Sequence, residues 1–280
     1  MSKKLSIQLT QPRPEVELHL PDGRVLSGPR GTKAGDFLQA IADTFPVPLV
    51  AAIVNGDLRE LTYPIEMDAR VQPVTMADAD GARIYRRSLT FLLEMAFADL
   101  FPKGTLMVDH SVASGGYYCQ VTGRKPLSES EIEALKVHMQ KLVASDQPFE
   151  RKEVPLNEAI EYFRSRGYDD KVSLLAYRKK DYLTLYRLGE RMDYHHGYMV
   201  PSTGYLRWFD LIPTNGGFTL RYPRRHKPTE LLPMPDYPKL LSAFRQYGDW
   251  LMHLGIDNVG ALNKAIEHGR GSEIILVSEA

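Results

Sequence analysis

The sequence has very little cysteine and no recognisable nucleotide-binding motif. Cys119 is the single cysteine among 280 residues, which excludes a disulfide framework and every cysteine-rich zinc module and fits a reducing compartment. No G-x-x-x-x-G-K-[S/T] or G-x-G-x-x-G segment occurs. The chain therefore carries neither a phosphate loop nor a dinucleotide-binding fingerprint of its own.

A net charge and long apolar runs are also missing. Thirty-five Lys and Arg balance 35 Asp and Glu, for a formal net charge of +0, so any contact with nucleic acid has to be local. The start, Met1-Ser2-Lys3-Lys4, is followed by alternating polar and apolar residues rather than a signal-peptide core, and no segment is apolar enough to span a membrane. We predict a cytoplasmic protein without a membrane partner, of roughly two-domain length.

Residues 1–77 predict a small β-rich domain. Asp22-Gly23 and Asn55-Gly56 are typical hairpin turns. Thr32 is predicted to cap a helix that continues to Phe45, with apolar residues at helical spacing. Strands are predicted at residues 5–9, 16–20, 24–26, 49–54, 58–61 and 69–74, where apolar residues alternate or form short runs.

The order of these elements resembles a TGS domain, the β-grasp module found in threonyl-tRNA synthetases and some GTPases. The resemblance rests on Leu20-Pro21-Asp22-Gly23, on the helix after Thr32, and on the segment 51–58. It implies a domain without catalytic residues.

Residues 81–227 predict an α+β domain, after a short polar junction. Ser128 and Glu131 have the spacing of a capping box that opens a helix ending near Leu142, and Gly167 is a typical helix stop. Helices are predicted at 83–100, 129–142 and 155–166, and strands at 106–108, 116–121, 172–177, 182–188 and 217–222. Residues 228–280 predict a short helical segment, with helices at 238–254 and 257–268, that leads towards a further domain.

Two histidines lie together at His195 and His196. Adjacent side chains on a strand point to opposite faces, so the two imidazoles do not converge on one metal. Asp193 faces the same side as His195, where its carboxylate could orient the imidazole. One buried and one exposed histidine without a catalytic role is the alternative.

The remaining candidates lie outside this segment. Cys119 in a strand is predicted to be a small buried apolar residue rather than a nucleophile. His110 stands at a strand end, either as a ligand contact or as a solvated histidine. The strongest local positive patch is formed by Arg221, Arg224, Arg225, His226 and Lys227, either a solvated loop or a phosphate site.

Residues 83–220 resemble the second additional domain of threonyl- and alanyl-tRNA synthetases, which hydrolyses mischarged tRNA in many threonyl enzymes. The matching stretches are 87–96, 115–118, 127–129, 171–175 and 193–201. Editing enzymes carry an H-x-x-x-H pair in the first stretch and a C-x-x-x-H pair in the last.

This chain departs from both motifs. Phe91 and Met95 stand at the first pair of positions, and His195 and Met199 at the second. Phenylalanine and methionine neither carry a proton nor hold zinc here, so we expect no metal, no catalytic residue and no ester hydrolysis by the family's route. With Lys171 and Asp193, these residues predict either a pocket for a small polar molecule or an inert core cleft.

Nearly the whole chain resembles the N-terminal half of bacterial uridine-kinase-like proteins of the phosphoribulokinase/uridine kinase family, through residues 197–206 and 269–280. That resemblance implies a non-catalytic, ligand-sensing region of a nucleoside kinase, a transferase, whose partners are its own C-terminal kinase domain and a nucleotide or RNA end. ATP and Mg²⁺ would belong to that kinase domain, and no cofactor is expected in this chain. The alternatives are an aminoacyl-tRNA deacylase using Lys171, Asp193 and His195, and an RNA-binding adaptor that binds through the TGS-like domain and the 221–227 patch.

Overall fold

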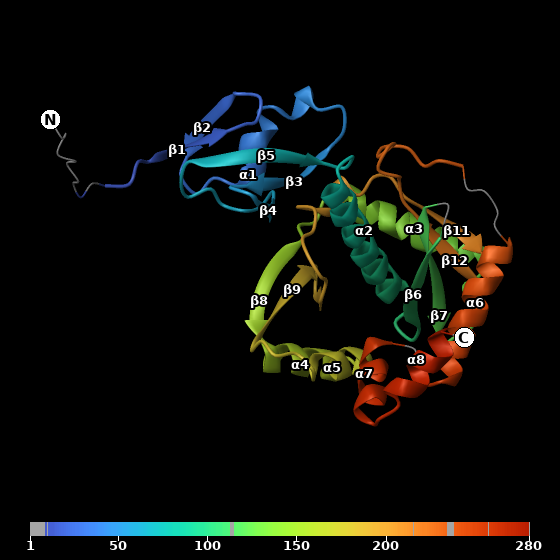
Figure 1. The fold of residues 1–280 in the computed structure, drawn as a ribbon. Helices are drawn as coiled ribbons and strands as arrows, with labels where there is room; N and C mark the ends of the chain where they lie inside the picture. The colour runs from blue at the N-terminus through green and yellow to red at the C-terminus, as the bar shows by residue number, and fades with distance from the viewer. Residues whose placement is uncertain are drawn as a thin grey trace.

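The computed structural model describes residues 9, 11–112, 115–214, 216–233, 238–256 and 258–279. Three sheets and their covering helices form an α+β fold that ends in helices, as predicted. Figure 1 shows the N-terminal sheet (blue) at one end of the molecule and the C-terminal helices (red) at the other. The strand predicted at 5–9 lies outside the described residues except for Leu9.

The N-terminal unit is a five-stranded sheet covered by one short helix. Its strands, in the spatial order β2-β1-β5-β3-β4, are β1 (Glu15–His19), β2 (Val25–Pro29), β3 (Leu49–Val54), β4 (Asp57–Glu60) and β5 (Ala69–Thr75). Asn55 and Gly56 have φ values of 51° and 93°, the left-handed conformation that a two-residue hairpin turn requires. Both predicted hairpins are present, since β1 pairs with β2 and β3 with β4, in each case antiparallel.

The helix predicted from Thr32 to Phe45 is wrong in its extent. Helix α1 covers Ala34–Gln39 only, and a separate 3-10 turn, η1, covers Ala42–Thr44. Thr32 does not cap α1: its carbonyl accepts a hydrogen bond from the backbone N–H of Ile65, and Lys33 occupies the N-cap position without a side-chain bond. The backbone here pairs with the segment around Ile65 instead.

The central unit is built around helix α2 (Ala79–Leu100) and a four-stranded antiparallel sheet. That sheet has the order β11-β12-β7-β6 and contains β6 (Thr105–Val112), β7 (Gly116–Thr122), β11 (Asp210–Thr214) and β12 (Gly217–Arg221). Helix α3 (Glu129–Ala144) packs on α2 and begins with the predicted capping box between Ser128 and Glu131. Val50 and Val74 of the N-terminal sheet join the core formed by α2 and these strands.

A second sheet, of order β10-β9-β8, completes the central unit. It contains β8 (Glu150–Pro155), β9 (Tyr182–Leu188) and β10 (Arg191–Asp193), and it packs on helices α4 (Leu156–Ser165) and α5 (Asp169–Leu175). The strand predicted at 172–177 is wrong, because Val172 and Leu175, three residues apart, both face this core from a helix. Strand β8 was missed since most of its side chains are exposed and polar.

The C-terminal helices are α6 (Pro238–His253), α7 (Val259–Glu267) and α8 (Gly271–Glu279), the first two as predicted. Helix α7 packs on α5, where the Tyr177 hydroxyl donates to Glu267 at 2.7 Å. None of the described helices is long and apolar enough to cross a membrane. The domain ranges 1–77, 81–227 and 228–280 stay proposals.

Gly81, in the first turn of α2, lies in tight contact with the N-terminal sheet. A Cβ at this position would lie 1.9 Å from the carbonyl oxygen of Thr75 and 3.0 Å from Cγ2 of Val50. Because a backbone carbonyl cannot rotate away as a side chain can, Gly81→Ala should lower the free energy of unfolding by about 1–3 kcal/mol or more.

Urea denaturation measures this change. Gly248→Ala in α6 is the matched control, because a Cβ there meets nothing within 4 Å, and it should be neutral or stabilise by up to about 1 kcal/mol. Equal stability of the two variants would show that α2 does not press on the N-terminal sheet as described.

Candidate functional site

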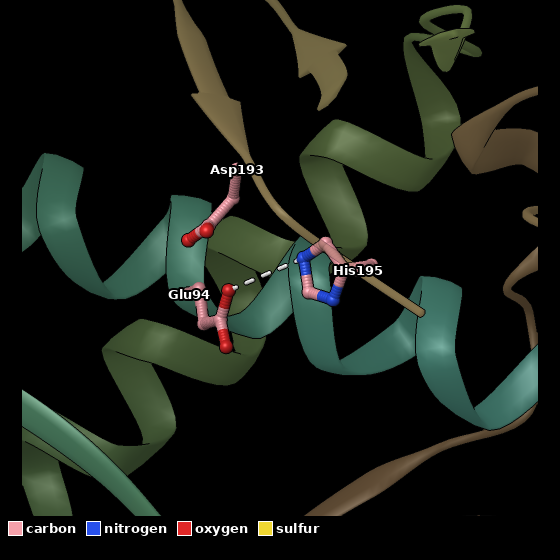
Figure 2. Close-up of side chains that lie close together, drawn as sticks. All are labelled: Glu94, Asp193 and His195. Carbon is pink, nitrogen blue, oxygen red and sulfur yellow. Dashed lines mark ion pairs between the residues drawn. The ribbon is translucent and has the colours of Figure 1, made fainter. Parts of the chain in front are cut away.

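Three side chains that can hold protons or metals converge between α2 and the segment after β10 (Figure 2). Glu94 comes from α2, Asp193 is the last residue of β10, and His195 follows it. The Oε2 atom of Glu94 lies 3.6 Å from Nε2 of His195. One ligand-type atom from each residue lies within 4.8 Å of the other two.

The path of the chain after β10 is fixed by contacts with α2. Gly197 has a φ of 103°, and a Cβ there would lie 2.9 Å from the Arg87 guanidinium. Arg87 in turn donates to the carbonyl of Tyr198 at 2.6 Å. These contacts hold the His195 imidazole over the ring of Phe91, with ring centroids 4.8 Å apart.

Asp193 is paired with Lys171 rather than with His195. The Lys171 ammonium, on α5, donates to Asp193 Oδ2, and the backbone N–H of Tyr194 donates to Oδ1 at 2.6 Å. Lys171 also lies over the ring of Tyr168, 4.9 Å from its centroid. Glu94, and not Asp193, is thus the carboxyl group that lies against the His195 imidazole.

Burial dominates the electrostatics of this cluster. It raises the pKa of Glu94 to about 8, helped by the negative charge of Asp193, and it lowers the pKa of His195 to about 4. Burial alone would lower the pKa of Lys171, but the charges of Asp193 and Glu94 outweigh it and raise that pKa. Within the described residues, neither Glu94 Oε2 nor His195 Nε2 has a hydrogen-bond partner.

The three apolar candidates belong to the core, and Phe91 packs directly on the His195 ring. Phe91, Met95 and Met199 are all buried, with at most 7% of their surface exposed. The Ser88 hydroxyl contacts the Met199 sulfur at 3.3 Å and accepts from the backbone N–H of Val200 at 2.9 Å. These residues shape the site and take no polar part in it.

The secondary candidates divide between other places. His110 lies on β6 in contact with Tyr118 and Asp109, away from the cluster. Cys119 is completely buried, as predicted, and burial raises the pKa of its thiol to about 12. Arg221 is buried, and its guanidinium donates to the carbonyl of Leu232, so the reading as a solvated loop residue is wrong for it.

Glu94 was not among the residues singled out from the sequence. It lies within the stretch 87–96, flanked by Leu93 and Met95. The available signal was a lone acidic residue inside an apolar part of a helix, which by itself does not distinguish a site from the solvent-facing side of α2.

His195 and the neighbouring His196 line an open cavity of about 530 Å³, here called the His195 cleft. Its walls are cationic and aromatic: Arg178 lies 5.9 Å from the ring centroid of Tyr194, and Lys180 lies 5.5 Å from that of Tyr182. The other lining residues are Arg151, Glu153, Thr184, Gly197 and Tyr198.

A second cavity of about 530 Å³, here called the basic pocket, lies where the start of α2 meets the segment after β12. Arg224 and Arg225 of the predicted positive patch line it, with His226 of the same patch and with Arg83 and Arg86 of α2. Arg83 is paired with Asp80, and Arg86 lies over the ring of Tyr222. This pocket is separate from the His195 cleft, since no residue lines both.

The N-terminal sheet contacts the site segment directly. Glu60, at the end of β4, is buried and accepts hydrogen bonds from the Tyr186 hydroxyl and, at 3.2 Å, from the backbone N–H of Met199. Arg59 Nη1 lies 3.3 Å from the Tyr198 hydroxyl. The N-terminal unit therefore helps to position the chain that carries His195.

Comparison with known proteins identifies the N-terminal unit and the relatives of the larger part of the chain. Residues 16–75 match the TGS domain family, which confirms the resemblance drawn for that unit. The chain is 31% identical over 204 residues to a threonine–tRNA ligase of Symbiobacterium thermophilum, covering 72% of this chain and 31% of that protein.

Two further threonine–tRNA ligases give the same picture. The ligase of Methylococcus capsulatus is 33% identical over 200 residues, which cover 71% of this chain and 31% of the relative. The ligase of Thermotoga maritima is 29% identical over 206 residues, which cover 73% of this chain and 31% of the relative. The chain thus spans about a third of the length of the relatives that it matches.

These matches overturn the resemblance to uridine-kinase-like proteins. The relatives are threonine–tRNA ligases, so the regulatory role in a nucleoside kinase, the transferase activity and the kinase domain as partner are wrong. The deacylase and RNA-binding alternatives fit the relatives better. The expectation that this chain uses no cofactor stays a prediction, as do the site residues.

Proposed function

We propose that this chain binds the aminoacylated 3′ end of a tRNA in the His195 cleft and hydrolyses its ester bond. The observation that carries the proposal is that His195, with Glu94 3.6 Å from its Nε2, lines an open cavity with cationic and aromatic walls. The relatives are threonine–tRNA ligases that match this chain over about a third of their length, which supports tRNA as the partner. We propose the cytoplasm, where tRNA is charged, as the place of action.

The walls of the cleft suit single-stranded RNA. Unpaired nucleotides bind by stacking of their bases on aromatic side chains and by attraction of the phosphates to Lys and Arg. Tyr182 and Tyr194 supply ring faces, and Arg178 and Lys180 supply the cations, which lie next to those rings. Because the chain has a net charge of zero, it can attract nucleic acid only through a local positive surface, and these side chains supply one.

Ester hydrolysis needs a proton acceptor for water and a donor for the leaving ribose oxygen. In the proposed step, a water oxygen bonds to the ester carbonyl carbon while Nδ1 of His195, the ring nitrogen that does not face Glu94, takes the water proton. The carbon–oxygen bond to the ribose then breaks, and the same proton passes to the leaving ribose oxygen, which becomes a hydroxyl. Lys171 provides a positive charge beside the pair, which favours the oxyanion that forms between the two steps.

This route does not use the H-x-x-x-H and C-x-x-x-H pairs of the editing enzymes. Phe91, Met95 and Met199 fill three of those four positions and are buried. Only His195 keeps a side chain that can exchange a proton, and Glu94 beside it comes from outside both motifs. The proposed activity therefore rests on a different set of groups.

Release of amino acid from charged tRNA, with correctly and incorrectly charged tRNAs compared, tests the proposal directly. We expect hydrolysis by the 280-residue chain, and its absence with every charged tRNA would contradict the deacylase function.

Charge reversal in the cleft tests how RNA is held. Arg178→Glu with Lys180→Glu should weaken binding of charged tRNA and make the dependence of log K on log salt shallower by about 1.4, since each lost phosphate contact on a single strand removes about 0.7. Arg164→Glu with Arg270→Glu, at exposed ion pairs outside the cleft, controls for net charge. An equal loss in both double variants would contradict a local role of the cleft.

RNA binding without hydrolysis is the second candidate, favoured by the basic pocket. Arg83, Arg86, Arg225 and His226 bring several cations into one cavity, which suits the phosphates of an RNA backbone. Binding that is lost on reversal of Arg83 and Arg225, and unchanged by reversal of Arg178 and Lys180, would favour this adaptor function over the deacylase.

A further inference from the structure

We propose that Glu94, Asp193 and His195 form a binding site for one divalent transition-metal ion, with Zn²⁺ the first candidate and Mn²⁺ the second. The proposal stands independently of the function proposed above, because the site is defined by its own geometry and its occupation can be measured without RNA.

The distance between the two unpartnered atoms fits a shared ion better than a hydrogen bond. Glu94 Oε2 and His195 Nε2 lie 3.6 Å apart, which exceeds the usual length of an N–H···O bond. Two ligands bound to one ion at 2.0–2.2 Å in tetrahedral geometry are about 3.3–3.6 Å apart. An ion between the two atoms would thus need little movement of either side chain.

Both atoms are also buried without a hydrogen-bond partner in the described part of the chain. Each has almost no exposed surface and no hydrogen-bond partner within the described residues, although the Glu94 side chain as a whole is 32% exposed. A buried polar atom without a partner is costly, and native proteins usually supply one from protein, water or an ion. A metal ion would satisfy an oxygen and a nitrogen at once.

Asp193 supplies the third ligand. Its carboxylate points towards Glu94 in Figure 2, and its ligand atom lies within 4.8 Å of those of Glu94 and His195. Two carboxylates and one imidazole suit Zn²⁺ or Mn²⁺, since imidazole is a good ligand for zinc and carboxylates for manganese. Three protein ligands leave at least one position for water, the arrangement typical of catalytic rather than structural ions.

This ligand set differs from the one that the editing motifs would supply. Phe91, Met95 and Met199 provide no ligand, and Glu94 and Asp193 lie outside the H-x-x-x-H and C-x-x-x-H positions. The site therefore uses one motif position, which holds His195, and takes its other two ligands from outside the motifs.

Lys171 opposes the ion and provides a test of the site. Its ammonium donates to Asp193 Oδ2, and a carboxylate oxygen has a second lone pair with which it can bind an ion as well. The positive charge of Lys171 nevertheless repels a cation bound beside Asp193. Replacing Lys171 by methionine should therefore tighten metal binding.

Calorimetric titration of the whole chain with Zn²⁺, Mn²⁺ and Mg²⁺, without RNA, tests the proposal. We expect one Zn²⁺ or Mn²⁺ per chain, weaker binding of Mg²⁺, and visible absorption bands of a low-coordinate ion when Co²⁺ is added. Glu94→Gln and His195→Ala should each lower the affinity by at least about tenfold. His138→Ala is the matched control, because His138 and Asp99 form a His–carboxylate pair, 3.1 Å apart, outside this cluster.

Three results would overturn the proposal: no stoichiometric ion in the unaltered chain, equal affinity in Glu94→Gln and His195→Ala, or no gain of affinity in Lys171→Met. The last variant decides the matter if the other two do not fold by circular dichroism. Hydrolysis of charged tRNA without metal binding would contradict this site alone, whereas metal binding without hydrolysis would contradict the proposed deacylase alone.

Discussion

His195→Ala is expected to lower the rate constant of ester hydrolysis by about 10²–10⁴-fold, the usual contribution of a proton-transferring side chain. The imidazole lines the cleft, and the ring of Phe91, whose centroid is 4.8 Å from that of His195, cannot exchange a proton. No neighbouring apolar side chain can therefore replace it. Binding of charged tRNA should change little, because the tyrosines and cations of the cleft walls remain.

Single-turnover release of amino acid separates these two effects, with binding measured in the same variant by fluorescence anisotropy. His138→Ala, in an ion pair with Asp99 outside the cleft, should hydrolyse within about twofold of the unaltered chain. Hydrolysis by His195→Ala at the unaltered rate would remove His195 from the proposed step. A loss of binding in proportion to the rate would instead assign it to recognition of the RNA.

Local sequence signals predicted much of the fold correctly. The capping box of Ser128 and Glu131 and the turn at Asn55-Gly56 depend on residues at most three positions apart, so the sequence determines them directly. The same holds for the apolar stripe of α2, which covers the core along most of its length. Elements whose residues bury a periodic face or close a short turn were therefore found.

Where distant segments compete, the sequence was a poorer guide. Val172 and Leu175 fit a short strand or a helix equally well, and packing on α4 decides for the helix. Thr32 has the chemistry of a helix cap, but pairing with Ile65 engages its backbone. In both cases contacts from another element outweigh a local preference.

The candidate site was predicted only in part, because some of its contacts join segments that lie far apart in the sequence. Asp193 and His195 are close in sequence, and their nearness could be expected. Glu94 reaches His195 from a helix that precedes it by a hundred residues, and the Arg221 guanidinium is buried against the Leu232 carbonyl. These partners follow from the packing of α2, β10 and β12, which no local pattern describes.

Glu60→Ala is expected to lower the free energy of unfolding by about 2–4 kcal/mol and to reduce hydrolysis as well. The buried Glu60 carboxylate is the shared acceptor for the Tyr186 hydroxyl and the Met199 N–H. A buried donor left without its acceptor costs about 1–3 kcal/mol, and alanine removes the acceptor from both. Met199 lies four residues after His195, so the freed segment is the one that holds the imidazole in place.

Glu60→Gln keeps one acceptor oxygen and should lose less than half as much stability as Glu60→Ala. Glu66→Ala is the control, because it removes an exposed carboxylate of the same domain, and it should lose almost no stability. Urea denaturation and single-turnover hydrolysis on the same samples provide both readouts. A double-mutant cycle with Tyr186→Phe should give a coupling energy of about 0.5–3 kcal/mol, as expected for two groups in one hydrogen-bond network. Additive effects of Glu60→Ala and Tyr186→Phe, with hydrolysis unchanged, would mean that the TGS domain packs on the central unit without positioning the site. A measured coupling would make that domain part of the machinery that holds His195.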